Sequence, residues 1–398
     1  MNKPTQFNSA YQQAQYIGPL QEEIAAQALA ADQSRSVDGN VIEQIKSSNV
    51  MRISASSELG GLDESICVIA DELSATAAAC TSTAWCLWNH LCTFHFFCGL
   101  LGPSNQEFLK NITEQHEWVC FPAGASSQVA GDVNGDSLVL NGVAAFGSGA
   151  RYAEWAGVIY NAGDDDAPDH KFTMVDLRQS AVRIEPTWEA MSVRASATDH
   201  IYYENATESA ARSVPFPETS REVMRDPEYP VIHPRYREDW VALSVVWLGA
   251  MAVGVANSSL EETANNIRDR YAIFGTKMAE RPTIHVNLGR ARGLINAARD
   301  TVYAACQETD ARIANRQSPS EIDYCRQTSA GTQAVLLCDE AMRLILRVLG
   351  GNGLRENTDF ERRYRDFQAM PLHINGHQDR ITELTGRHLL GLENNSPI

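Results

Sequence analysis

Residues 284–305 read IHVNLGRARGLINAARDTVYAA, and this stretch decides the fold class. Its apolar side chains recur at steps of four and three residues, which place them on one face of a helix. They are Ile284, Leu288, Ala291, Ile295, Ala298, Val302 and Ala305. Because such a stripe is buried only against other helices, the stretch predicts a helical bundle in this part of the chain.

Two further long helices are expected to complete the bundle. Residues 239–256 are nearly all apolar, which predicts a core helix. Ser318 is predicted to be the N-cap of the last long helix, with Pro319 in the first turn and Glu321 closing a capping box. We expect that helix to end at Leu349, before two glycines. Residues 232–398 are therefore predicted to form a C-terminal helical-bundle domain.

The first part of the chain, residues 1–120, is predicted to be an N-terminal helical domain. Strong helix formers fill residues 20–31, and residues 63–79 continue with apolar and small side chains. Residues 82–101, STAWCLWNHLCTFHFFCGLL, are apolar on almost every side. A helix of that kind is expected to be buried.

Short β-type runs dominate the middle of the chain. Residues 133–140 contain Asn-Gly-Asp, a hairpin signal, and further runs stand at 155–161, 172–177 and 201–203. Five prolines between residues 215 and 234 disfavour helix and indicate a boundary. We predict a middle β domain over residues 121–231, and an α+β fold class that is mainly α.

Composition excludes some partners and favours a reducing compartment. The net charge of −17 disfavours nucleic acid. The polar start and the expected lack of an apolar stretch of about 18 residues indicate no signal peptide and no membrane segment. Nine scattered cysteines without zinc-type spacing suggest free thiols and no metal site. These features predict a cytoplasmic protein.

Several motifs, in this order, resemble the acyl-CoA dehydrogenase superfamily. Phe146-Gly147-Ser148-Gly149 followed by Trp155 is similar to the strand segment that faces the flavin ring. Residues 191–196 (MSVRAS) are similar to the M-G-x-R-x-S/T turn. Arg270 with Phe274-Gly275, and the glycines at 350–353 followed by RRYRD (362–366), resemble the family's later elements. The resemblance covers nearly the whole chain and implies the acyl-CoA dehydrogenase fold, packed as a homotetramer.

One departure from the family pattern points to a particular branch. Many dehydrogenases of this superfamily carry a catalytic glutamate about eight residues after the Arg-Asp pair, whereas this chain has His373 almost there. Together with Ser82-Thr83-Ala84-Trp85, this is similar to the oxygenase components of two-component monooxygenases. The lack of a G-x-G-x-x-G nicotinamide fingerprint agrees with that branch.

The branch implies a cofactor, a partner and a reaction. Its members take reduced FAD or FMN from a separate NAD(P)H-flavin reductase and use O2 as co-substrate. The oxidant is a C4a-hydroperoxyflavin, which must be kept away from water. The resemblance therefore implies hydroxylation of a small aromatic substrate, phenolic or indolic.

Two residues are the first candidates for catalysis. Ser148 resembles the family serine that bonds ring nitrogen 5, although a serine between glycines can also be an ordinary turn residue. His373 follows Pro371, and we expect it in the first turn of a helix, whose dipole would lower its pKa. A neutral imidazole could accept a proton from a phenol or an indole, or relay one. The structural alternative is an ordinary capping or surface histidine.

Other candidates lie in the apolar helix predicted over residues 82–101. The branch usually carries a pocket histidine about eight residues after the tryptophan, a place held here by Thr93, so His90 and His95 both remain catalytic candidates. Trp88, Thr93 and His95 are the candidate substrate-binding residues. Histidine and aromatic residues in such a helix are also common core residues.

The resemblance also implies a set of flavin-binding residues. They are Trp85, Phe146, Ser148, Trp155, Ser196, Arg270, Phe274 and Gly351. Arg270 would give bidentate contacts to a phosphate, although a surface ion pair is the alternative.

Three other functions stay open on the sequence. The first is a true acyl-CoA dehydrogenase, against which the missing glutamate argues. The second is an N- or S-oxidising relative of the same branch. The third is a flavin-free binding or structural protein that kept the scaffold.

Overall fold

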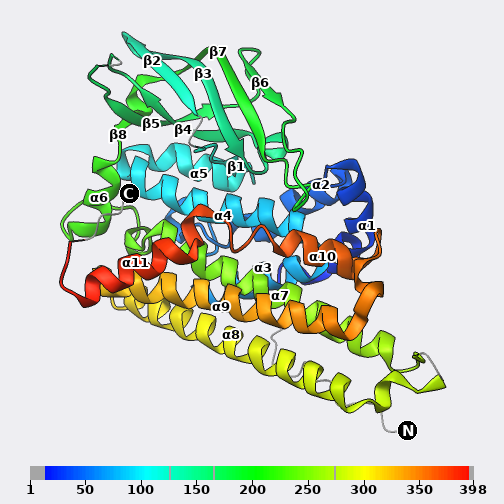
Figure 1. Cartoon of the computed structure of the whole chain (residues 1–398). Helices are drawn as coiled ribbons and strands as arrows, with labels where there is room; N and C mark the ends of the chain where they lie inside the picture. The colour runs from blue at the N-terminus through cyan, green and yellow to red at the C-terminus, as the bar shows by residue number, and fades with distance from the viewer. Residues whose placement is uncertain (1–13, 125–126, 165, 273–274, 394–398) are drawn as a thin grey trace.

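The computed structural model describes residues 14–124, 127–164, 166–272 and 275–393. A sheet lies at one end of a stack of helices, and the helices near the chain start flank both (Figure 1). The N-terminal part contains α1 (Gln21–Ser34), α2 (Gly39–Ser47), α3 (Ile66–Ala79), α4 (Thr81–Leu101) and α5 (Gln106–Glu114).

Helix α4 lies beneath the sheet and is the most enclosed of these helices (Figure 1). Every residue of α4 except Asn89 is buried. It packs against α3, α7 and α10 and against the short strand β1 (Val119–Cys120). The expectation of a buried helix over residues 82–101 is therefore confirmed.

The sheet has the order β6-β7-β3-β2-β4-β5-β8, with β1 paired to β4. Its other strands are β2 (Gln128–Asn134), β3 (Ser137–Gly147), β4 (Trp155–Asn161), β5 (His170–Asp176), β6 (Val182–Glu185), β7 (Asp199–Ser209) and β8 (Val214–Pro215). Strands β2 and β3 pair in antiparallel fashion up to Asn134 opposite Ser137. The hairpin predicted from Asn-Gly is thus confirmed.

The C-terminal half is helical, as the repeat in residues 284–305 predicts. It contains α6 (Glu218–Arg225), α7 (Trp240–Ile267), α8 (Pro282–Ala314), α9 (Glu321–Leu349), α10 (Asp359–Phe367) and α11 (Gln378–Leu389). Helix α7 packs against α3, α4, α8 and α9. A Cβ on Gly331 of α9 would lie 2.2 Å from the carbonyl oxygen of Val245 in α7, so only glycine permits this close crossing.

Three local expectations need correction. The N-cap of α9 is Ser320 with Asp323, two residues later than the expected Ser318 and Glu321, because the Ser320 hydroxyl and the Asp323 carboxylate cap each other's backbone N–H groups. Helix α6 occupies part of the proline-rich passage. Its residues 218–225 contain no proline, so nothing in that run blocks helical hydrogen bonds.

The third correction concerns α7, which continues to Ile267 and is long and apolar enough to cross a membrane by length and composition. The expectation that no such stretch exists was wrong. However, 89% of its most apolar window is buried inside the protein. A core helix of a bundle meets the same criteria.

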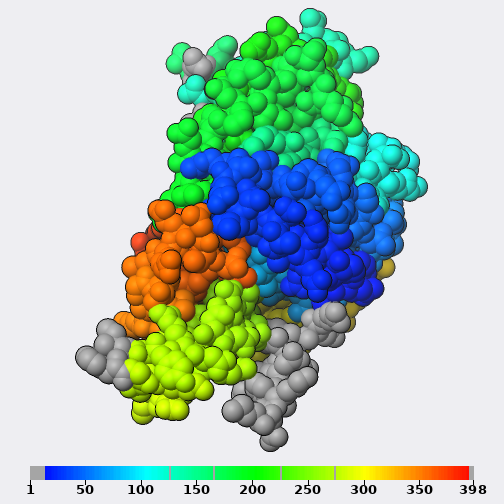
Figure 2. All heavy atoms as spheres, turned by 90° about the vertical axis from the view of Figure 1, so that its right-hand side faces the viewer, coloured from blue at the N-terminus to red at the C-terminus, as the bar shows by residue number. Residues whose placement is uncertain are grey.

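The N-terminal helices contact the C-terminal segment that precedes α11. Figure 2 shows α1 and α2 in blue beside the orange segment around α10. Asp32 in α1 accepts two hydrogen bonds from Arg365 in α10, at 3.0 and 2.9 Å. These hydrogen bonds join α1 to α10.

Candidate active site

Three segments far apart in the sequence converge on Ser148, in the turn that follows β3. The indole N–H of Trp85 in α4 donates to Ser148 Oγ at 3.1 Å. Thr198 Oγ1, just before β7, lies 2.9 Å from the same oxygen, and Ser196 Oγ lies 2.7 Å from Thr198 Oγ1. All four side chains are buried.

The order of these hydroxyls determines where the Ser148 proton can point. Ser196 can donate to Thr198, and Thr198 can then donate to Ser148, which also accepts from Trp85. A hydroxyl oxygen has two acceptor positions and one proton. In that arrangement both acceptor positions of Ser148 are filled and its own O–H is available to a ligand, whereas in the reverse arrangement Ser148 donates to Thr198.

The backbone around Ser148 is strained at three positions. Phe146, Val193 and Ala197 have φ angles of 63°, 42° and 48°. A positive φ is unfavourable for a side chain of this kind, above all for β-branched valine, and such strain gathers at functional sites.

Neighbouring elements hold the strained turn over residues 191–197 in place. Val193 donates its N–H to Asp366 Oδ1 in α10 at 2.7 Å, and Gly149 donates its N–H to the Ser196 carbonyl at 2.8 Å. Burial raises the pKa of Asp366 to about 6. The turn and the Ser148 loop therefore form one rigid unit.

Phe146 presents its ring to solvent from this unit. Its side chain is 49% exposed, and its ring has edge contacts with Trp188 and His200 at centroid distances of 6.3 and 6.1 Å. Gly124 lies directly beneath the ring, because a Cβ there would approach Phe146 to 2.3 Å. An exposed aromatic ring near a serine hydroxyl suits a flat heteroaromatic ligand.

His373 approaches the same place from the C-terminal segment. Its ring lies edge-on to Trp88 and Trp85, at centroid distances of 4.9 and 5.5 Å. Burial of the ring, and to a smaller extent the positive charge of Arg380 in α11, lower the pKa of His373 to about 4. The expected direction is confirmed, but the cause differs. His373 precedes a single short turn (Ile374–Gly376) rather than entering a long helix, so burial replaces the helix dipole as the main cause.

His90 is engaged by the backbone at both ring nitrogens. Its Nδ1 accepts from the N–H of Val119 at 3.0 Å, and its Nε2 lies 3.3 Å from the carbonyl of Met51. Burial lowers its pKa to about 4. These contacts tie α4 to β1 and to the short 3-10 helix Asn49–Arg52 between α2 and α3, so His90 has no nitrogen free for a ligand.

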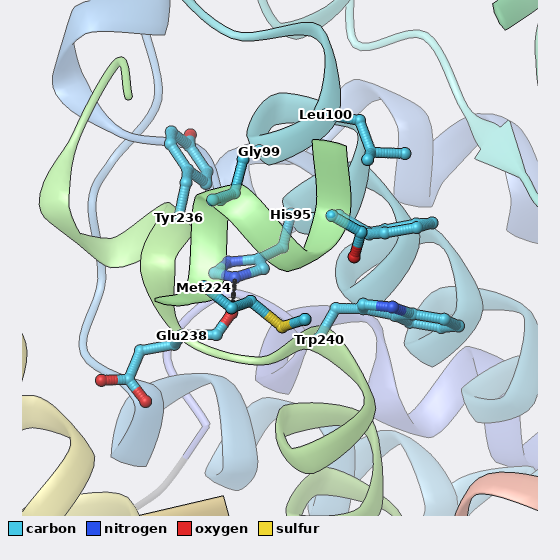
Figure 3. A pocket seen from close by; sticks show the side chains of 10 residues that line it. His95, Gly99, Leu100, Met224, Tyr236, Glu238 and Trp240 are labelled. Carbon is cyan, nitrogen blue, oxygen red and sulfur yellow. Dashed lines mark hydrogen bonds between the residues drawn. The ribbon is translucent and has the colours of Figure 1, made fainter. Parts of the chain in front are cut away.

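His95 lies elsewhere, in a narrow crevice between α4 and α6 (Figure 3). Its Nε2 lies 3.0 Å from the Glu238 carbonyl, whereas its buried Nδ1 has no partner in the described part of the chain. Met224 and Trp240 line the same crevice. The free space at its centre is about 10 Å³, enough for at most one water molecule.

Two candidate substrate-binding residues on α4, Thr93 and Trp88, donate their hydrogen bonds to backbone carbonyl groups of the protein. Thr93 donates its hydroxyl to the carbonyl of Asn89, one turn earlier, at 2.7 Å. Trp88 is fully buried and donates its indole N–H to the Ser244 carbonyl at 2.9 Å. Trp88 thus reaches the site by the ring contacts it makes with His373 and Trp85, at centroid distances of 4.9 and 5.2 Å.

In the described part of the chain, three further candidates (Trp155, Arg270 and Gly351) form no hydrogen bond with Ser148. Trp155 packs edge-on against Phe108 and donates to Glu117 at 2.7 Å. Arg270 follows the far end of α7, and Gly351 lies in the exposed turn after α9. Phe274 lies outside the described residues.

Sequence patterns left two supporting residues out. Thr198 carries the hydrogen bond from Ser196 to Ser148, and Asn375 supports His373. Thr198 could have been suspected because it stands two residues after Ser196 at the start of an alternating strand. Nothing in the sequence distinguishes Asn375 from an ordinary turn asparagine.

Comparison with known proteins shows which sequences and folds this chain resembles. Residues 246–378 match the family model "Acyl-CoA dehydrogenase, C-terminal domain". The oxygenase component of p-hydroxyphenylacetate 3-hydroxylase from Acinetobacter baumannii is 22% identical over 388 residues, which cover 95% of this chain and 88% of that protein.

Two solved structures have the same architecture over almost the whole chain. XiaF from a Streptomyces species, in complex with FADH2 and glycerol, superposes with a TM-score of 0.86 at 19% identity and covers 96% of this chain and 95% of its own. The dibenzothiophene monooxygenase TdsC from Paenibacillus sp. A11-2, with FMN and indole, gives 0.80 at 16% identity, covering 95% and 97%.

The predicted fold is thereby confirmed. Helices, a middle sheet and a helical C-terminal domain follow one another in the order shared with these proteins. Residues 246–378 thus resemble the C-terminal domain of acyl-CoA dehydrogenases, and almost the whole chain has the fold of XiaF and TdsC.

Proposed function

We propose that this protein is the oxygenase component of a two-component flavin-dependent monooxygenase that hydroxylates a small aromatic compound. The observation that carries the proposal is the convergence of Ser148, Trp85 and His373 from three separate segments. The similarity to the Acinetobacter oxygenase component supports it, because that relative is named as a hydroxylase of a phenol.

The residues present fit a flavin. Ser148 would offer its O–H to a ring nitrogen, and the exposed ring of Phe146 would cover part of the flavin. Trp85 holds the Ser148 oxygen, while Thr198 and Ser196 hold it from behind. Bound reduced flavin supplies the two electrons with which O2 is cleaved, one oxygen atom going to the substrate and the other to water.

The protein's own residues would control water and protons. Trp85, Trp88 and the ring of His373 form an aromatic wall with little room for water. His373 is neutral near pH 7 because burial lowers its pKa to about 4. A neutral imidazole can hold a hydrogen bond to a phenol or indole without bringing a charge into this wall.

Arg270, Phe274 and Gly351 would serve the flavin only if a second subunit brought them to it. We propose a homotetramer, which the apolar side chains exposed on the C-terminal domain support. These include Leu354, Leu372, Leu389 and Leu390, each at least 66% exposed. Reduced FAD or FMN would come from a separate NAD(P)H-flavin reductase in the cytoplasm, where the nine free cysteines would stay reduced.

Acyl-CoA dehydrogenation is the second candidate, favoured by the family match over residues 246–378. That reaction needs a carboxylate base, and His373 stands almost where the family's glutamate is expected. Asp366, a nearby carboxylate, is occupied by the Val193 N–H and is fully buried.

The test uses purified full-length protein. Flavin-free protein is titrated anaerobically with reduced FMN and reduced FAD, and 18O2 is then added with 4-hydroxyphenylacetate, resorcinol or indole. We expect reduced flavin to bind and one 18O atom to enter a ring. If the protein binds oxidised flavin tightly and an acyl-CoA reduces it, the protein is a dehydrogenase instead. If it binds neither oxidised nor reduced flavin, it is a flavin-free binding or structural protein.

A further inference from the structure

The two ring nitrogens of His373 are not equivalent. Asn375, two residues later, donates its backbone N–H to His373 Nδ1 at 3.3 Å, so the imidazole caps the short turn that follows it. A nitrogen that accepts an N–H carries no proton of its own. In a neutral imidazole the proton must then be on Nε2.

A second set of contacts fixes this turn against α7 and α4. Asn375 is 5% exposed, and its side-chain amide donates to Ser244 Oγ at 3.0 Å. The Ser244 carbonyl accepts the indole N–H of Trp88, whose ring lies 4.9 Å from that of His373. The position of the imidazole and its protonated nitrogen are therefore set by one network.

The charge near the ring favours an electron-rich partner. Arg380 in α11 donates to the carbonyl of Ile374 at 3.2 Å and acts electrostatically on His373. The rings of Trp85 and Trp88 that face His373 carry no charge. A positive charge beside a neutral N–H donor stabilises an anionic oxygen.

We infer that His373 meets the substrate as a hydrogen-bond donor through Nε2–H, and that the substrate presents an anionic oxygen to it, as a phenolate does. Asn375 and Ser244 are the positioning residues that fix this tautomer. The phenol proton then goes to solvent rather than to His373, whose proton count does not change. The identity of the substrate rests on the proposed function, whereas the tautomer does not.

The tautomer can be measured without flavin or turnover. Protein labelled with 15N at histidine is examined by NMR at pH 7.5, and His373→Gln identifies the signals of His373. We expect an unprotonated Nδ1 and a protonated Nε2. A proton on Nδ1, or protons on both nitrogens, overturns the inference.

Ser244→Ala tests the positioning network. It removes the acceptor of the Asn375 amide while leaving the carbonyl that binds Trp88. We expect a mixture of both tautomers in this variant, and the same in Asn375→Ala. Ser259→Ala is the matched control, because Ser259 is a buried serine of the same helix whose hydroxyl has no partner in the described part of the chain. Unchanged tautomer signals in both test variants would remove Asn375 and Ser244 from this role.

The donor role is tested with 4-cyanophenol carrying 13C at the hydroxyl-bearing carbon, bound anaerobically to protein with reduced FMN. We expect the 13C shift of the phenolate at pH 7 while His373 keeps one proton. A doubly protonated His373 would make it the base and overturn the donor role. If the oxygenation test above fails while the Nε2–H tautomer is observed, the proposed function falls and the tautomer assignment stands.

Discussion

Trp85 in α4 donates its indole N–H to Ser148 Oγ at 3.1 Å, across the junction between the helical domain and the sheet. Thr198 Oγ1 lies 2.9 Å from the same oxygen, and either hydroxyl of this pair can donate. When Thr198 donates, both acceptor positions of Ser148 are filled and its own proton is free for a ligand. The site therefore depends on a helix and a strand meeting at one hydroxyl group.

Trp85→Phe keeps an aromatic side chain at this position and removes the indole N–H that donates to Ser148. We expect the free energy of unfolding to fall by about 1 kcal/mol, and hydrogen peroxide release to increase because Ser148 is less firmly oriented. Chemical denaturation and a peroxide assay measure the two effects. Trp118→Phe is the control, since the buried indole N–H of Trp118 has no partner in the part of the chain that the structure describes. Equal peroxide release by both variants would contradict the role of the Trp85–Ser148 bond.

Ser148→Ala removes the hydroxyl itself. We expect peroxide release to rise roughly tenfold, the equivalent of one hydrogen bond of about 1.4 kcal/mol. Thr198→Val is expected to have a smaller effect, because Trp85 would still hold the Ser148 oxygen. Product yield per flavin oxidised is the measurement. An effect of Thr198→Val as large as that of Ser148→Ala would show that the hydroxyls do not act in this order.

His373→Ala is expected to lower the fraction of flavin oxidation that yields product. In the native protein His373 should contribute no pH dependence to this fraction between pH 6 and 9, because its pKa of about 4 keeps the imidazole neutral over that range. Arg380→Gln should raise that pKa while leaving it below its ordinary value, because burial persists. As the pH is lowered, the fraction of flavin oxidation that yields product should therefore begin to fall at a higher pH in Arg380→Gln than in the native protein. Arg387→Gln, on the same helix, is the control, and identical pH profiles would exclude the influence of Arg380.

His95→Gln is predicted to reduce sensitivity to acid. Burial lowers the pKa of His95 from 6.5 to about 3. As pH falls below 6.5, the unfolded chain binds a proton at His95 that the folded protein refuses, so this residue costs stability between pH 6.5 and 3. When the pH is lowered from 7 to 5, the free energy of unfolding of the variant should fall by about 2 kcal/mol less than that of the native protein. Denaturation at both pH values checks this, with the exposed His170→Gln as control, which should behave as the native protein does.

Arg312→Met is predicted to destabilise the bundle strongly. Arg312 forms two hydrogen bonds with the buried Glu238, at 3.0 and 2.7 Å. Removing one partner leaves a buried carboxylate uncompensated, at a cost of about 3–5 kcal/mol. Because burial raises the pKa of Glu238 and Arg312 holds it down, the loss should be larger at pH 8 than at pH 5. The control is the exposed ion pair between Arg290 and Glu340. Arg290→Met should lower the free energy of unfolding by less than about 1 kcal/mol.

Local patterns along the chain were enough to predict the class and order of the elements. The apolar stripe in residues 284–305 and the apolar run in 82–101 are local patterns with helical period, and Asn-Gly sets a hairpin within a few residues. Local signals failed only at details, as at Ser320, where two neighbouring serines could each cap α9 and the carboxylate of Asp323 decides between them.

Only the tertiary structure decided which candidates work together. Five residues on α4 are candidates for the site by sequence. Trp85 donates a hydrogen bond to Ser148, and Trp88 contacts His373. The other three instead form hydrogen bonds with backbone groups, and they are His90, Thr93 and His95. Successive residues of a helix point about 100° apart, so packing against β1, α6 and α7 assigns each a different neighbour. Asn375 could not be found beforehand, because its partner Ser244 stands 131 positions earlier and is brought to it only by the fold.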